Sequence, residues 1–220
     1  MTKIIAADFT PTSFLLPARD VQAVYCARSS EETRYYLTGV YIERVDHVNE
    51  PGSTVHIVAT DGHILLDKIA PDSAWVGSEC TTQDSDNIGG FILSVDVMEK
   101  AFKAKTVGDL WILGDIKTGI LQFIDVDSPL SDGAQFNRVG VCEFGRIDGT
   151  FPDYRRVLPI QGDNSAPLTF DPVYYAQLAK ANKLLGGTAI TLNAQAVGDP
   201  ISVGFPKVPL LTGVMMPMRA

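Results

Sequence analysis

The chain has 220 residues, of which 45% are hydrophobic and 20% are charged, so it is long enough for one large or two smaller domains with a real core. The formal net charge of −8 excludes a protein that wraps nucleic acid with its whole surface, and any DNA contact should be local. Cys26, Cys80 and Cys142 are odd in number and scattered, which argues against a disulfide framework or metal cluster and indicates a reducing compartment.

No segment of the sequence is expected to enter a membrane. The longest uncharged apolar stretch, Val208–Met218, contains two prolines and falls well short of the ~20 residues of a membrane span. The amino-terminal MTKIIAADFT lacks the apolar run of a signal peptide. We therefore expect a soluble, cytoplasmic protein.

The first of three repeated patterns of predicted elements starts at Ser13. Strand formers, hydrophobic periodicity and the turn pair Asp61-Gly62 predict a strand, a helix and three further strands. The strand SFLLP at Ser13 precedes a helix over Ala18–Ser30 and strands over Arg34–Arg44, Thr54–Thr60 and His63–Ile69.

Two further repeats follow the polar loop Gly77–Gly90. The second has the same order of elements over Phe91–Ser94, Val95–Lys105, Asp109–Leu113, Gly119–Val126 and Arg138–Phe144. In the third, Gly186-Gly187 is the expected helix C-cap. Its elements are expected over Leu168–Phe170, Asp171–Leu185, Thr188–Asn193, Ile201–Phe205 and Leu211–Met218.

A four-stranded sheet with one helix cannot bury its apolar face alone, so two such units should pack into one domain. The sequence therefore predicts an α+β fold of three βαβββ units. The first two units form a complete domain over residues 1–150, residues 151–165 form an ordered connector, and residues 166–220 form half a domain. The third unit is expected to have no partner within its own chain and to favour self-association.

The connector carries the run FPDYRRVLP at Phe151–Pro159, whose prolines and apolar side chains indicate an ordered segment lying against a folded body. Together with ATDGH at Ala59–His63 and MPMR at Met216–Arg219, this run resembles the bacterial DNA polymerase III β subunit family, the sliding clamps. The resemblance covers the middle domain and half of the last domain, which implies a shortened clamp. It also implies a sliding-clamp fold with sheets outside and helices on one inner face.

In sliding clamps the inner helices surround duplex DNA without reading its sequence. The three predicted helices hold seven basic and four acidic residues, a net charge of +3, which leaves −11 for the rest of the chain. Such a wall suits a sleeve that attracts phosphates weakly, although the helix dipole alone would also place basic residues late in each helix. The DNA-facing residues implied by the resemblance are Arg19, Arg28, Lys100, Lys103, Lys105, Lys180 and Lys183.

A closed ring limits the number of chains. Helix axes on a circle of roughly 19 Å radius, with neighbours ~10 Å apart, give about 12 helices around a duplex. Three helices per chain then require about four chains. We expect a homotetramer if the ring closes, or a smaller assembly that does not encircle DNA.

The three matched motifs imply a hydrophobic pocket for the short linear clamp-binding motif of DNA polymerase, the clamp loader and repair proteins. Flexible methionines, an accessible glycine backbone and rigid prolines suit such a pocket. Leu65, Val214 or Met216 taken alone would be interpreted as a core strand residue, but the coincidence of three motifs favours the pocket. Its implied lining is Leu37, Thr60, Gly62, His63, Leu65, Pro152, Arg156, Val157, Val214, Met216, Pro217 and Met218.

The chain departs from the family at four positions. Ile64 stands where the family commonly has arginine, and Val95-Asp96 stands where it often has basic residues. Glu31 occupies a position where the family has a polar DNA contact. Duplex contacts are therefore not carried over to Val95, Asp96 and Glu31, and Ile64 leaves partner preference open.

The resemblance implies a processivity factor, acting at the nucleoid, that tethers polymerase to duplex DNA without catalysis, cofactor or metal. The alternative is a clamp-derived adaptor that keeps the peptide pocket but never encircles DNA. A hydrolase using Asp61 and His63 is a third hypothesis, but no GxSxG, HExxH, P-loop or CxxC motif accompanies them. Solvated charge is the usual meaning of acidic pairs such as Asp84/Asp86 and Asp125/Asp127.

Overall fold

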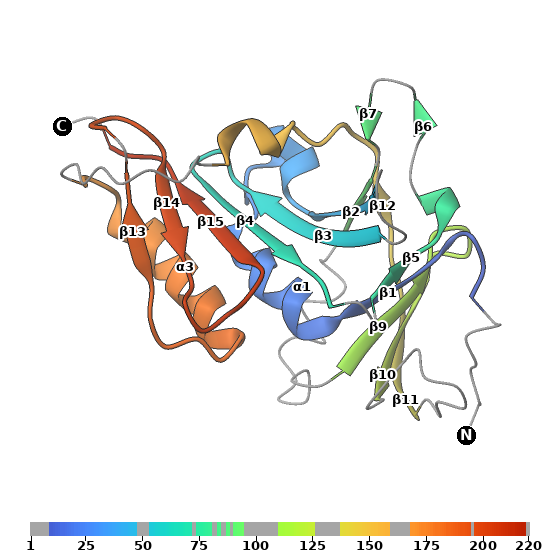
Figure 1. Cartoon of the computed structure of the whole chain (residues 1–220). Coiled ribbons are helices and arrows are strands. Elements are labelled where there is room, and N and C mark those ends of the chain that lie inside the picture. Colours follow the sequence, from blue (N-terminus) through green and yellow to red (C-terminus); the bar gives the residue numbers. More distant parts are fainter. Residues whose placement is uncertain are drawn as a thin grey trace.

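In the part of the chain that it describes, the computed structural model shows two large antiparallel sheets, with the helices α1 and α3 on one face of the larger sheet (Figure 1). The residues that the structure describes are 9–47, 53–71, 74–80, 83–84, 87–88, 90–94, 110–125, 137–158, 168–194 and 196–218. The predicted helix Val95–Lys105 lies outside them.

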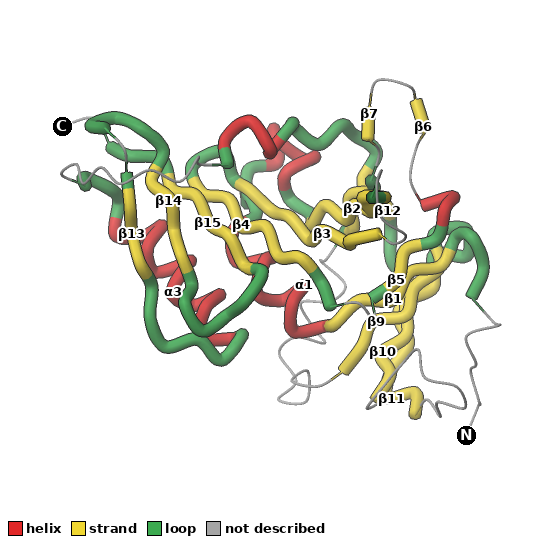
Figure 2. The backbone as a smooth tube through the Cα atoms, viewed as in Figure 1, coloured by secondary structure: helices red, strands yellow, loops and turns green. Residues whose placement is uncertain are grey.

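One sheet has five strands, all paired antiparallel (Figure 2). Its order is β11 (Asn137–Glu143), β10 (Ile120–Asp125), β9 (Leu110–Asp115), β1 (Ser13–Pro17) and β5 (Trp75–Val76).

The other large sheet has eight antiparallel strands, and it carries the candidate site. Its order is β12 (Arg146–Ile147), β8 (Phe91–Leu93), β2 (Val40–Asp46), β3 (Ser53–Thr60), β4 (Ile64–Ile69), β15 (Leu211–Met215), β14 (Ile201–Gly204) and β13 (Thr191–Asn193). A separate two-stranded pair consists of β6 (Gln83–Asp84) and β7 (Asn87–Ile88).

The first strand of each early repeat joins the sheet of the other repeat. β1 belongs to the first repeat but pairs with β9 of the second, while β8 belongs to the second but pairs with β2 of the first. The first two repeats are therefore interlocked through their first strands.

The helices α1 (Ala18–Val24) and α3 (Pro172–Leu184) lie on the same face of the eight-stranded sheet and contact each other (Figure 1). Short 3-10 turns are η2 (Tyr25–Ala27), η3 (Glu32–Leu37), η4 (Ser78–Cys80) and η6 (Tyr154–Val157). Helix α3 begins where Asp171 Oδ1 accepts a hydrogen bond from Val173 N at 2.8 Å. It ends at Leu184 with Leu185 as its C-cap, and Gly186, the next residue, has the positive φ of 80° that favours glycine after a helix.

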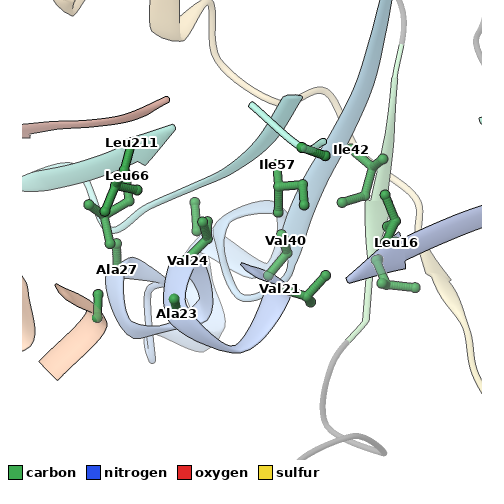
Figure 3. Packing of buried hydrophobic residues seen from close by; sticks show 14 of the residues in the cluster. Leu16, Val21, Ala23, Val24, Ala27, Val40, Ile42, Ile57, Leu66 and Leu211 are labelled. Atoms are coloured by element: carbon green, nitrogen blue, oxygen red, sulfur yellow. The ribbon is translucent and has the colours of Figure 1, made fainter. Parts of the chain in front are cut away.

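The main core, which we call the inner core, combines buried residues of α1, α3 and the inner face of this sheet with residues of β1, β9 and β10 of the five-stranded sheet. Val21 and Val24 of α1 point toward Ile57 of β3 and Leu66 of β4, all of them completely buried (Figure 3). Alternation along each strand sends the next residues to the other face of the sheet. That outer face carries a second buried cluster, described below.

The prediction that the third repeat has no partner within its chain is wrong for one edge of its strands, the edge formed by β15. β15 pairs with β4 over five residue pairs, and α3 packs beside α1. The hydrophobic periodicity of the sequence does not predict the pairing of β15 with β4, because pairing along a sheet edge depends on backbone groups rather than on side-chain type.

Two predicted strands differ in the structure. The RYYL segment forms the 3-10 turn η3 instead of the start of a strand, with Arg34 at φ −109° and ψ 48°. Ser29 N donates to Leu37 O at 3.0 Å, which closes this turn and buries Leu37. Leu168–Phe170 leads into α3 and forms no strand in the described part of the chain.

Candidate functional site

The turn between β3 and β4 is held by its own side chains. Asp61 Oδ1 accepts hydrogen bonds from His63 N at 2.8 Å and Ile64 N at 2.9 Å, while Thr60 Oγ1 donates to Ile64 O at 2.7 Å. Gly62 has a φ of 92°, in the region that favours glycine. Asp61-Gly62 is thus accounted for by turn structure, and the exposed His63 side chain projects from a fixed backbone.

The carboxyl-terminal motif lies directly beside this turn. The β4–β15 ladder ends at the pair Ile64–Met215, and the next residue, Met216, donates its backbone N–H to His63 O at 2.7 Å. The side chains of Met216 and Met218 are 38% and 52% exposed. Two of the three matched motifs, far apart in the sequence, therefore meet.

The third motif covers the outer face of the same sheet, where its η6 turn lies across the sheet from α1 and α3 (Figure 1). Phe151 stacks on Tyr41 with ring centroids 4.6 Å apart. We call the buried residues here the outer cluster: Leu37, Tyr41, Val58, Leu65, Ile92, Phe151, Tyr154 and Val214. The connector motif thus shares a buried cluster with Leu65 of β4 and Val214 of β15, the strands that adjoin the other two motifs.

A buried carboxylate fastens the connector to this face. Glu43 of β2 is completely buried, and its Oε2 accepts hydrogen bonds from Tyr154 O–H at 2.9 Å and Arg155 Nη2 at 2.6 Å. Burial, and next the charges of Asp67 and Glu43, raise the pKa of Tyr154 far above its ordinary value, so this phenol stays a donor. We call these three residues, Glu43, Tyr154 and Arg155, the connector latch.

A second polar pair lies beside the latch. His56 Nδ1 is 3.0 Å from Asp67 Oδ1, and the His56 ring centroid is 6.5 Å from that of Tyr154. Burial, and then the charge of Glu43, raise the pKa of Tyr41 to about 12, and its hydroxyl accepts from Gly90 N at 2.9 Å. The outer face therefore combines an apolar cluster with a buried polar network, in which Glu43 Oε2 accepts two hydrogen bonds.

The predicted lining residues divide into a buried floor and an exposed rim. The floor consists of Leu37, Thr60, Leu65 and Val214, each less than 8% exposed. The rim residues, half-buried or exposed, are Gly62, His63, Pro152, Arg156, Val157, Met216, Pro217 and Met218. The rim carries the side chains that a partner can reach.

Sequence reasoning missed Tyr174 of α3, which stacks on His63 with ring centroids 5.2 Å apart and an interplanar angle of 14°. Slight burial, followed by the charges of Asp61, Asp171 and Glu31, raises the pKa of Tyr174. Its signal in the sequence was the Asp171-Pro172 helix start, which places Tyr174 in the first turn of α3.

Ile64, where the family commonly has arginine, is 2% exposed and packs in the inner core. Its side chain therefore points away from the rim.

The basic residues on the helices differ in exposure. Arg19, Lys180 and Lys183 are exposed, whereas Arg28 is half-buried with its guanidinium 3.9 Å above the Tyr25 ring. Lys100, Lys103 and Lys105, like Val95 and Asp96, lie outside the described residues. Glu31 lies at the surface, where it pairs with Arg34 at 3.3 Å.

Asp20, one of the acidic residues counted on α1, is buried against the sheet. Its Oδ2 is 3.8 Å from Lys68 Nζ of β4, and burial raises the pKa of Asp20. This carboxylate is therefore directed at the protein interior, which leaves Arg19 as the exposed charge of that turn.

Among the described residues, no helix is long and apolar enough to cross a membrane. The same residues contain no group of three His, Cys, Asp or Glu side chains placed to hold a metal ion.

The chain is similar to curated proteins named Beta sliding clamp from two strains of Caulobacter vibrioides, with 36% identity over 155 residues. That alignment covers 69% of this chain and 34% of each relative, so the chain matches about a third of their length. No family model matches the chain.

Solved structures match the architecture along the whole chain. A DnaN sliding clamp from Bartonella birtlesii, bound to griselimycin, has a TM-score of 0.64 at 19% identity and covers 100% of this chain and 68% of its own. This is a sliding-clamp fold. A Caulobacter crescentus sliding clamp has the fold at a TM-score of 0.61 and 19% identity, covering 99% of this chain and 70% of its own. The clamp of Pseudomonas aeruginosa reaches 0.59 at 18% identity, with coverages of 100% and 69%.

Proposed function

We propose that the chain is a subunit of a DNA sliding clamp that acts without catalysis in the cytoplasm. In this role it tethers DNA polymerase, the clamp loader and other proteins with a linear clamp-binding motif to duplex DNA. Two observations support the proposal: Met216 N donates to His63 O beside the β3–β4 turn, and Phe151 and Tyr154 of the connector share one buried cluster with Leu65 of β4 and Val214 of β15.

The rim and floor suit a short hydrophobic peptide. Exposed Met216, Met218 and Val157 offer flexible apolar contacts beside a floor that is already packed. Two or three anchors at ~1.5–3 kcal/mol each, less the ordering cost, correspond to roughly micromolar affinity. Such affinity suits partners that exchange on one clamp.

A fluorescence titration with a clamp-motif peptide tests the peptide surface. We expect the double substitution His63→Ala and Met216→Ala to abolish binding while leaving the fold intact, because both side chains are exposed. His47→Ala with Val197→Ala is a matched control, since both residues are also exposed and neither belongs to the rim. Unchanged binding by the first pair would remove the assignment of this surface.

We propose further that the exposed basic residues on the helix side face duplex DNA, in a ring of about four chains when closed. Retention on circular but not on linearised DNA tests closure, because only a closed ring is topologically held. Peptide binding without retention on circular DNA would favour the adaptor that never encircles DNA.

A further inference from the structure

The first strands of the first two repeats follow one rule of pairing. β1 pairs on one side with β9 of the other repeat, and β8 pairs with β2 of the other repeat. In both cases the pairing is antiparallel, and the first strand of one repeat lies beside the second strand of the other repeat in the sheet. The exchange is reciprocal, because each repeat gives one strand and receives one.

The other side of each first strand pairs with the trailing segment of its own repeat. β1 pairs with β5, which follows β4, and β8 pairs with β12, which follows β11. Each first strand is thus held between its own trailing segment and the second strand of the neighbouring repeat (Figure 2).

In the third repeat, the segment that precedes the helix also contacts the trailing segment of its own repeat. Met218, in the segment that trails β15, donates its backbone N–H to Thr169 O at 2.8 Å. Thr169 lies in Leu168–Phe170, the segment that immediately precedes α3, as β1 immediately precedes α1. The position of a first strand is therefore occupied in the third repeat.

In the part of the chain that the structure describes, the third repeat lacks the second kind of pairing, in which a first strand pairs with the second strand of another repeat. β13, the second strand of the third repeat, pairs with β14 and forms the edge of the sheet, with no further neighbour in the part of the chain that the structure describes. Leu168–Phe170 likewise has no second strand beside it among these residues. An extended edge of this kind is a template for pairing with another segment.

We propose that two copies of this chain complete each other through their third repeats. Leu168–Phe170 of each copy pairs antiparallel with β13 of the other, around one two-fold axis. Such an interface is isologous, so both open edges close at once. This inference rests on the strand pairing of the first two repeats, and not on peptide or DNA binding.

The two segments have matching faces for this pairing. Leu168 and Phe170 pack partly buried against the inner core, and so do Ile190 and Leu192 at β13. Thr169 is exposed, and so are the alternate residues of β13. Because paired residues share a face, Thr169 must lie opposite Thr191 or Asn193 of the partner copy.

Native mass spectrometry and sedimentation of the purified chain test the assembly. We expect a species of twice the 23.8 kDa chain mass, with monomer appearing on dilution. Four-chain rings would then be built from such dimers. A chain that stays monomeric up to its solubility limit would overturn the proposal. That result would also be obtained if a different protein, rather than a second copy, paired with the β13 edge.

Mixed cysteine variants test the geometry. Thr169→Cys is mixed with Thr191→Cys in one sample and with Asn193→Cys in another, and each is treated with a mild oxidant. We expect a disulfide-linked heterodimer in one of the two mixtures, above the background of the wild-type cysteines. Thr169→Cys mixed with Val141→Cys, on the exposed face of β11, is the matched control. Dimers without a cross-link in either mixture, or cross-linking in the control alone, would overturn the proposed pairing.

A peptide titration on the cross-linked dimer separates this proposal from the proposed function. A cross-linked dimer that binds no peptide would contradict the peptide surface and leave the interface standing. A monomer that binds peptide would contradict the proposed interface and leave the peptide surface standing.

Discussion

Replacing Tyr154 by phenylalanine removes one hydroxyl from the connector latch and leaves the ring in the outer cluster. The hydroxyl donates to Glu43 Oε2 at 2.9 Å, and the carboxylate is completely buried. Glu43 Oε1 has no protein hydrogen-bond partner, so Oε2 carries the compensation for burying the charge. After the substitution, Arg155 would be the remaining donor of the latch.

The expected loss follows from the charge of the acceptor. A hydrogen bond to a charged group contributes about 1.5–3 kcal/mol, and removing one donor from a buried acceptor exposes part of its desolvation cost. The side chain of Arg155 is 38% exposed and still pairs with Glu43, which keeps the cost near the lower half of that range. We expect Tyr154→Phe to lower the free energy of unfolding by about 2 kcal/mol, or the Tm by about 4–8 °C.

Urea and thermal unfolding followed by circular dichroism measure this loss. Tyr35→Phe is the matched control, because Tyr35 is 53% exposed on η3 and should change stability little. A loss below about 0.5 kcal/mol for Tyr154→Phe would refute the view that the latch holds the connector. Equal losses for both variants would refute it as well.

Three further predictions concern other parts of the chain. Gly62→Ala should lower the free energy of unfolding by about 1–2 kcal/mol because of its φ of 92°, whereas Gly145→Ala should be neutral, since an added Cβ there meets no atom within 4 Å; urea titration of both decides this. For Asp115, partial burial acts to raise the pKa, but donated hydrogen bonds from three hydroxyls and a backbone N–H outweigh it and lower the pKa well below 3.8. The stability that Asp115 adds over Asp115→Asn should therefore be complete above about pH 4 and shrink as the pH falls further; a constant difference in acid unfolding curves would contradict this. Lys180→Glu with Lys183→Glu should weaken duplex DNA binding and reduce the slope of log affinity against log salt by about 2, and an unchanged slope would remove these residues from the DNA-facing set.

The β3–β4 turn and the helix of the third repeat could be predicted from the sequence, because turn and capping residues lie within or next to these elements. Asp61-Gly62 marks the β3–β4 turn, and the predicted helix Asp171–Leu185 differs from α3 by one residue at each end. The RYYL segment was predicted as a strand because tyrosine and leucine favour strands. Its 3-10 turn arises from tertiary packing, since Leu37 is buried in the outer cluster.

The exchange of first strands could not be predicted from periodicity. β1 and β8 are buried along nearly their whole length, so their side-chain pattern does not distinguish one sheet from the other. The latch was missed for a related reason. Glu43 lies on the face of β2 opposite the inner core, where a charged residue normally indicates solvent, and only the connector, more than a hundred residues later, buries it.

The candidate site joins segments that are fixed by different forces, and this determines how it can change. The floor residues Leu65 and Val214 pair across the β4–β15 ladder, so their positions depend on backbone hydrogen bonds and change only if the sheet does. The rim residues Val157 and Met216 instead project from the ends of the connector turn and of β15, where side chains are exposed. Substitutions at the rim should therefore alter which peptides bind the proposed surface without unfolding the chain. Substitutions in the latch should affect both peptide affinity and stability, because Val157 lies two residues after Arg155 in the same turn, η6.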